Sequence, residues 1–126
     1  KGAKRALPLP VSAPFHSSLL KPASDRLREY MQSLVFSAPQ IALINNVDVA
    51  IVNDPEAIKD ALVRQAASPV RWVETVRKIA AEGVTHVVEC GPGKVLAGLT
   101  KRIDDSLISD MIIDQASLDK MLETFK

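Results

Sequence analysis

The chain has 126 residues, 47% of them hydrophobic, which is enough to form one modest domain around a core. Its formal net charge of +1 gives no reason to expect a nucleic acid or a membrane surface as a partner. Its one cysteine, Cys90, excludes an internal disulfide and is typical of a reducing compartment. We recognise no apolar run as long as a membrane span and no signal peptide, and we expect a cytoplasmic protein.

The first part of the chain predicts one long helix with one strand before it and one strand after it. Apolar residues dominate positions 5–12 and 41–45, so each run is expected to form a strand, with a brief extension at 49–52. Ser17 or Ser18 can cap the helix, and Pro22 is tolerated in its first turn. The helix is expected to end near residue 34, and its apolar residues recur at helical spacing: Leu20, Ala23, Leu27, Tyr30, Met31 and Leu34.

The rest of the chain alternates helices and strands. Asp54-Pro55-Glu56 predicts a helix start, and a second helix is expected to begin at Ser68-Pro69 and to end at Gly83. Strands are expected at 84–90 and 107–113, with a sharp turn and a helix over 94–103 between them and a terminal helix over 118–125. This alternation predicts an α/β fold with a mainly parallel sheet. The expected inward residues of the three middle helices are Ile58, Ala61, Leu62 and Gln65; Val70, Val73, Val76, Ile79 and Ala80; and Val95, Leu96 and Leu99.

One histidine stands between the first predicted strand and the first predicted helix. His16 follows Ala13-Pro14-Phe15, at a junction where side chains project from a rigid frame. Histidine can take and release a proton near neutral pH, so His16 can act as a general base. Its position alone fits an ordinary surface or half-buried histidine at a loop better than it fits a base.

The segment from Lys4 to Ser17, KRALPLPVSAPFHS, resembles the active-site histidine segment of malonyl-CoA:acyl carrier protein transacylases, the malonyl transferases of bacterial-type fatty-acid synthesis. The similarity continues, in the order and spacing of that family, through residues 45–48, 60–65, 69–72 and 89–96. It covers almost the whole chain but only about the last two-fifths of a family member. We therefore expect a chain cut from a longer one, of which it forms the C-terminal portion.

This resemblance also implies an architecture. Residues 1–18 would close a small ferredoxin-like subdomain that carries the histidine, and residues 19–126 would form the C-terminal part of a larger subdomain built like an α/β hydrolase. The boundary is expected near residues 17–22. A first strand separated from its partners would have unpaired edges.

The chemistry that the resemblance implies is acyl transfer in two steps. A serine takes malonyl from malonyl-CoA, and the pantetheine thiol of acyl carrier protein then takes it from the serine. His16 matches the general base, and Gln65 matches the residue whose main-chain carbonyl orients the imidazole. No bound cofactor and no metal are expected, since the phosphopantetheine arrives on the carrier protein. The implied partners are acyl carrier protein, the coenzyme A thioester and the N-terminal part of the same enzyme.

The nucleophile is not in this chain. No two of its glycines bracket a serine as the Gly-x-Ser-x-Gly elbow requires, and the family's malonyl-binding arginine and oxyanion-hole glutamine match no segment here. We therefore expect the chain alone to be inactive. Two alternatives stay open: a non-catalytic module that docks acyl carrier protein, and the acyltransferase unit of a polyketide synthase. Phe15, the residue before the histidine, resembles the type that uses malonyl rather than methylmalonyl.

Two further sets of polar residues are candidates for binding, one for substrate and one for the carrier protein. Asn46, beside Asn45, matches a turn near the family's cleft and is a candidate for substrate binding, although asparagines in turns usually bond to the local backbone. Arg5, Lys101 and Arg102 could dock the acidic carrier protein. The latter two also suit an ordinary solvated helix end, where cations complement the helix dipole.

The remaining motifs predict structure rather than chemistry. Gly91-Pro92-Gly93-Lys94 lacks the Gly-x₄-Gly-Lys-Ser/Thr pattern of a phosphate-binding loop and predicts a turn, after which the helix start could weakly favour an anion. His86 and Cys90 are four positions apart in a predicted strand, about 13 Å, which is too far for a direct contact. Cys90 is expected to be a small, buried apolar residue.

Overall fold

The computed structural model describes residues 2, 4, 6–8 and 10–126. These residues divide into two compact units. Unit 1 holds the chain up to residue 42 together with 52–70, and unit 2 holds residues 43–51 and 71–126. The subdomain boundary predicted near residues 17–22 stays a prediction.

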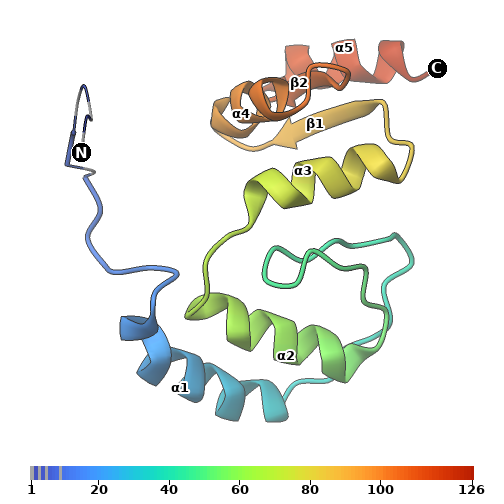
Figure 1. The fold of residues 1–126 in the computed structure, drawn as a ribbon. Coiled ribbons are helices and arrows are strands. Elements are labelled where there is room, and N and C mark those ends of the chain that lie inside the picture. Colours follow the sequence, from blue (N-terminus) through green and yellow to red (C-terminus); the bar gives the residue numbers. More distant parts are fainter. Residues whose placement is uncertain (1, 3, 5, 9) are drawn as a thin grey trace. The chain divides into compact units, whose positions relative to one another are not determined.

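Unit 1 is built on two packed helices (Figure 1). A short 3₁₀ helix, η1 (Ser18–Leu20), leads into α1 (Lys21–Gln32), which packs against α2 (Pro55–Ala66). The predicted start of α2 is confirmed, because the Asp54 carboxylate accepts a hydrogen bond of 2.8 Å from the Ala57 amide. Helix α1 carries Pro22 in its first turn, as predicted, and ends two residues short of position 34.

The inward row of α1 differs in part from the predicted row. Ala23 and Tyr30 are exposed, and the residue that takes the central buried place is Ser24, which is only 4% exposed. The row that is at least half-buried follows the spacing of one helix face: Leu20, Ser24, Leu27, Met31 and Leu34. The buried row of α1 therefore contains the Ser24 hydroxyl, whereas the predicted row contained only Ala23 at this turn of the helix.

Two predicted strands do not form. Among the described residues of 5–12, none is in a strand, and Leu7 and Val11 are 65% and 67% exposed. Residues 41–45 contribute only an isolated antiparallel bridge between Ile44 and Ile51, and Ile41 is 83% exposed. A strand is stable when a neighbour completes its backbone hydrogen bonds. In the described part of the chain, residues 41–45 have only the short partner at Ile51, and the described residues of 5–12 have no strand beside them.

Unit 2 contains a parallel two-stranded sheet with a crossover helix (Figure 1). Strand β1 (His86–Cys90) is followed by α4 (Val95–Ile103) and β2 (Ile108–Ile112), so that His86 pairs with Ile108 and Cys90 with Ile112. Helix α4 packs on both strands, α3 (Trp72–Ala81) packs on α4, and α5 (Gln115–Thr124) packs on β2. This confirms the predicted α/β class, with a small parallel sheet.

Backbone contacts set the ends of the helices in unit 2. Helix α3 begins later than the predicted Ser68-Pro69, because the Arg71 amide donates to the Asn46 carbonyl instead of entering a helix. It ends before Gly83, as predicted, since Gly83 adopts a positive φ of 82° that favours glycine. Helix α5 begins three residues before the predicted position, at a reciprocal capping box between Asp114 and Ser117.

The predicted inward face of α4 is wrong. Val95 is 68% exposed, whereas Ala97 and Thr100 are only 7% and 1% exposed. The small residues of α4 are therefore its buried row, and the bulky apolar row is left to solvent. The exposure of that row reflects the small sheet, which covers only part of the helix surface.

Candidate functional site

His16 sits in a strained turn that leads into η1. Its φ of 57° lies in the left-handed region, where non-glycine residues are uncommon. The Ser17 hydroxyl donates a 2.7 Å hydrogen bond to the Pro14 carbonyl and closes the turn, so it does not cap the helix as we predicted. Strain of this kind costs about 1–3 kcal/mol and persists only where surrounding contacts impose it.

The turn brings the His16 ring to the end of α2. Its Nδ1 lies 3.1 Å from the main-chain carbonyl oxygen of Gln65. A carbonyl oxygen can only accept, so in this hydrogen bond Nδ1 carries the hydrogen. In the neutral ring Nε2 then keeps its lone pair and can accept a proton. Both residues belong to unit 1.

The Gln65 carbonyl is available because it lies in the last turn of a helix. The last four carbonyls of a helix lack the usual intrahelical partners. The Arg64 carbonyl accepts from the Ala67 amide at 3.2 Å, and the Gln65 carbonyl accepts from the Ser68 amide at 3.3 Å as well as from His16. The Val63 carbonyl accepts instead from the Ser24 hydroxyl of α1, at 2.7 Å. Two donors from the segment around α1 thus satisfy carbonyls at the end of α2.

The Gln65 side chain has a separate task. Its amide nitrogen donates to the carbonyls of Ser68 and Pro69, at 3.2 and 3.3 Å. These bonds fasten the chain that follows α2. The orienting group next to His16 is therefore backbone, while the side chain supports the local loop.

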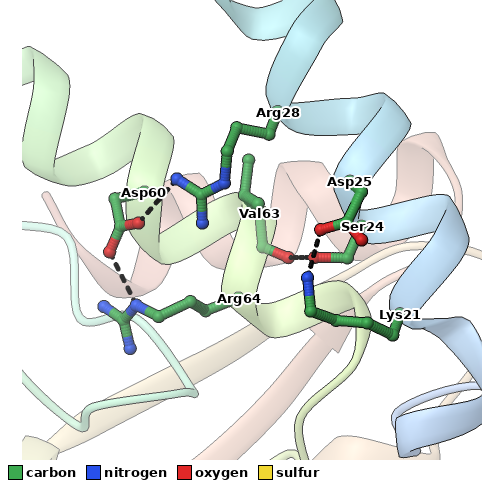
Figure 2. Close-up of polar contacts among 7 residues, drawn as sticks. All are labelled: Lys21, Ser24, Asp25, Arg28, Asp60, Val63 and Arg64. Carbon is green, nitrogen blue, oxygen red and sulfur yellow. Dashed lines mark hydrogen bonds and ion pairs between the residues drawn. The ribbon is translucent and has the colours of Figure 1, made fainter.

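A charge cluster also joins α1 to α2 (Figure 2). Asp60 accepts from Arg64 Nε at 2.6 Å and from Arg28 Nη1 at 3.1 Å. The hydrogen bond from Arg64 and then the one from Arg28 hold the pKa of the Asp60 carboxyl below its usual range. All three side chains are more than a third exposed, so solvent screens these pairs and their contribution to stability is below about 1 kcal/mol.

The two asparagines belong to unit 2 and are engaged in structural bonds. Asn45 accepts from the Asp48 amide at 2.7 Å and donates to the Ala50 carbonyl at 3.2 Å, the local bonding expected in a turn. The Asn46 side-chain oxygen accepts from the Thr75 hydroxyl at 3.1 Å and ties this turn to α3. A role of Asn46 in substrate binding stays a prediction.

The candidate docking residues lie at one helix end or outside the described part. Lys101 and Arg102 are exposed in the last turn of α4, where their charge complements the helix dipole. Arg5 lies outside the described residues. Both interpretations of the pair therefore stay open.

The glycine turn after β1 is confirmed, and an acidic side chain already serves the helix that follows. Glu89 Oε2 accepts a 2.8 Å hydrogen bond from the Ala97 amide in the first turn of α4. The anion favoured at this helix start is therefore a carboxylate of the same chain.

The cysteine and the second histidine take no part in a shared site among the described residues. Cys90 is exposed at the end of β1, so the prediction of a buried cysteine is wrong; the two-stranded sheet leaves that end uncovered. The His86 ring packs edge-on against Phe125, with centroids 5.4 Å apart. In the described residues, no three His, Cys, Asp or Glu side chains gather to hold a metal ion. Nor does any helix in that part combine the length and apolarity of a membrane span.

An exposed imidazole held through Nδ1 by a backbone carbonyl is an arrangement that general acid–base catalysis can use, and His16 has this arrangement within unit 1. Comparisons with known proteins make this more specific. The chain is 54% identical over 121 residues to the malonyl CoA-acyl carrier protein transacylase of Salmonella typhimurium. The aligned residues make up 96% of this chain and 39% of that protein. The predicted resemblance to these transacylases is thus confirmed, although no family model matches the chain.

Solved structures agree. An acyl-carrier-protein S-malonyltransferase from Burkholderia pseudomallei matches with a TM-score of 0.92 and 72% identity, over 97% of this chain and 40% of the other. A malonyl-transacylase in complex with its type II PKS acyl-carrier protein matches with a TM-score of 0.94 and 52% identity, over 98% and 40%. The chain therefore spans about 40% of the length of the relatives that it matches.

Proposed function

We propose that this chain is the C-terminal portion of a malonyl-CoA:acyl carrier protein transacylase and that it supplies the general base, His16. The observation that carries the proposal is the 3.1 Å contact between His16 Nδ1 and the Gln65 carbonyl, which leaves Nε2 to accept a proton. The likeness of nearly the whole chain to malonyl transferases supports the choice of substrate.

The same proposal covers the finer architecture. Residues 1–18 close a ferredoxin-like subdomain, and residues 19–126 complete an α/β-hydrolase-like subdomain of a cytoplasmic enzyme. The parallel β1–α4–β2 unit supports this division, as does the absence of a strand among the described residues 6–8 and 10–12.

In the first half-reaction, His16 Nε2 removes the proton from a serine hydroxyl supplied by the rest of the enzyme. The serine oxygen attacks the thioester carbonyl of malonyl-CoA, and the carbon–sulfur bond breaks. The leaving coenzyme A thiolate takes the proton from the imidazolium. Throughout, the Gln65 carbonyl accepts from Nδ1–H and keeps the ring oriented.

The second half-reaction repeats the proton transfers with the carrier protein. His16 Nε2 removes the proton from the pantetheine thiol, whose sulfur attacks the seryl ester. The serine oxygen leaves and takes the proton back. Malonyl ends on the carrier protein, and the enzyme regains its starting state, so no redox cofactor is needed.

Docking of the carrier protein is assigned to the exposed pair Lys101 and Arg102, with Arg5. Acyl carrier proteins are acidic, and a basic rim speeds their approach. A Lys101→Glu/Arg102→Glu double variant should lower the association rate of carrier protein and its salt dependence. Lys120→Glu/Lys126→Glu makes the same change of charge on the C-terminal segment as a control. Equal effects of the two double variants would contradict this assignment.

Replacement of each histidine tests the base. In the complete transacylase that carries this segment, His16→Ala should lower kcat for malonyl transfer by ~10²–10⁴-fold, the usual contribution of a positioned base. His86→Ala removes the other imidazole, which packs on Phe125, and should leave kcat nearly unchanged. Similar rates for wild type and His16→Ala would refute the proposal.

Acyl-group preference separates the polyketide-type alternative. Phe15, which is 63% exposed, precedes the histidine and marks the malonyl-using type. The complete enzyme should load malonyl-CoA in preference to methylmalonyl-CoA. The reverse preference would move the assignment to the acyltransferase unit of a polyketide synthase.

A further inference from the structure

We propose that Ser24 is a positioning residue for His16. Its hydroxyl holds α1 against the last turn of α2, and this keeps the Gln65 carbonyl within reach of the imidazole. The inference rests on the proposed role of His16 as the base.

The Ser24 contact is a buried link between two helices (Figure 2). Ser24 is 4% exposed, and its Oγ donates to the Val63 carbonyl at 2.7 Å. Val63 itself is 1% exposed. Because α2 ends at Ala66, the Val63 carbonyl lacks the usual intrahelical donor four residues on, and its partner comes from the neighbouring helix. A buried carbonyl keeps such a partner, because the bond is strong where water is excluded.

This link and the His16 contact share the same two rigid segments. His16 lies eight positions before Ser24, in the turn that leads into the η1–α1 helical run and is closed by the bond between Ser17 and Pro14. Gln65 lies two positions after Val63 in the last turn of α2. Neighbouring residues of a helix move together, because each rise of 1.5 Å is fixed by backbone hydrogen bonds. A slip of α2 past Ser24 therefore changes the distance between His16 Nδ1 and the Gln65 carbonyl.

The other polar contacts near this link are less suited to the task. Arg28 and Asp60 also join α1 to α2, but their side chains are 50% and 43% exposed, and solvent screens the pair. Lys21 and Asp25 form an ion pair within α1 and cannot hold the two helices together (Figure 2).

The tautomer of the His16 ring is the direct readout. The 126-residue chain contains two histidines, so ¹⁵N NMR of its ring nitrogens can follow His16 with His86 as an internal reference. In the wild type, neutral His16 should carry its hydrogen on Nδ1. Ser24→Ala should shift the population toward the Nε2–H form and leave His86 unchanged. Ser33→Ala is the control, because the Ser33 hydroxyl bonds to the Tyr30 carbonyl at the end of the same helix.

Ser24→Cys gives a second variant, with a weaker donor of similar shape, in case Ser24→Ala does not fold. It should shift the His16 tautomer in the same direction by a smaller amount. An unchanged tautomer in a folded Ser24→Ala or Ser24→Cys chain would overturn the inference.

Kinetics on the complete transacylase separates this inference from the proposed function. Ser24→Ala should lower kcat about tenfold with KM unchanged, less than the ~10²-fold cost of a 1 Å misplacement. Val76→Ala, a cavity in unit 2, controls for general destabilisation and should not lower kcat at a temperature where it is folded. A shifted tautomer with an unchanged kcat would leave Ser24 as a positioning residue and contradict the role of His16 as the base. An unchanged tautomer in Ser24→Ala, together with an inactive His16→Ala enzyme, would support His16 as the base and contradict Ser24 as its positioning residue.

Discussion

His16 presents one ring nitrogen to a backbone carbonyl and leaves the other free for chemistry. A carboxylate in the orienting place would add a negative charge beside the imidazole, whereas the Gln65 carbonyl offers only the dipole of a helix end. The orienting atom is also independent of the side chain that carries it. At this position the fold, rather than the residue type, provides the contact with the imidazole.

Gln65→Ala tests this independence. The variant keeps the carbonyl and loses two side-chain bonds to the Ser68 and Pro69 carbonyls, each worth about 0.5–1.5 kcal/mol. We expect lower stability in urea unfolding and a kcat for malonyl transfer close to wild type. Gln65→Pro, which disrupts the last turn of α2, should lose activity. A loss of kcat in Gln65→Ala as large as in His16→Ala would show that the side chain, not the backbone, is essential.

The sequence predicts the contact between His16 and Gln65, but it does not predict the contact that Ser24 makes. Resemblance identified the first pair, because their segments match a known motif. Ser24 carries no motif, and its role depends on which carbonyl it meets after folding. One signal was present: Ser24 stands at helical spacing between Leu20 and Leu27, on the face that was expected to be apolar.

Asp60 makes the stability of the packing between α1 and α2 depend on pH. Hydrogen bonds from Arg64 and Arg28 lower the pKa of Asp60, so the folded chain binds this proton less readily than the unfolded chain. The resulting stability is present above the usual aspartate pKa of about 3.9 and is lost as the pH falls through the folded value. Acid should therefore weaken the link between the two helices.

Asp60→Asn should flatten the acid limb of the stability curve. We expect the free energy of unfolding of the wild type to fall below about pH 4 and that of Asp60→Asn to fall less, by under about 1 kcal/mol. Urea unfolding at a series of pH values measures both. Asp105→Asn, at an exposed aspartate in unit 2, is the control. Parallel curves for wild type and Asp60→Asn would show that the pair contributes nothing measurable.

The N-cap of α2 is a second element-scale test. Asp54→Ala removes the acceptor for the Ala57 amide and should cost about 1 kcal/mol of unfolding free energy. Asn53→Ala, one position earlier, should cost less. If both variants unfold at the same urea concentration, the cap is not the source of the stability of α2.

Helix boundaries were more predictable than strands because their signals are local. The Asp54 cap and the positive φ of Gly83 act within one turn of their own helices. A strand instead needs a partner elsewhere in the chain, so the apolar runs at 5–12 and 41–45 carried half of the necessary information. The strands at β1 and β2 form because each provides the other with that partner.

Across the whole molecule, apolar surface is left uncovered in both units. Ile41 and Leu19 of unit 1 are 83% and 73% exposed, and Val95 of unit 2 is 68% exposed. In unit 2, a groove of about 520 Å³ between the end of β1 and α5 is lined by apolar residues that include Leu122 and Phe125. Surfaces of this kind promote association.

We therefore expect the isolated chain to self-associate. Sedimentation velocity should show a weight-average mass that rises with concentration, and Leu122→Lys/Phe125→Lys should reduce the rise. A single monomeric species at every concentration would contradict this expectation.

The rate at which malonyl loads onto the nucleophile measures the contribution of His16. We propose that this chain brings the base, His16, to a serine that lies outside it. Intact mass spectrometry of the complete transacylase, quenched shortly after mixing with malonyl-CoA, should show the gain of one malonyl group in the wild type. The same gain should appear ~10²–10⁴-fold more slowly in His16→Ala. Equal loading rates, or a malonyl adduct on the isolated 126-residue chain, would contradict the account.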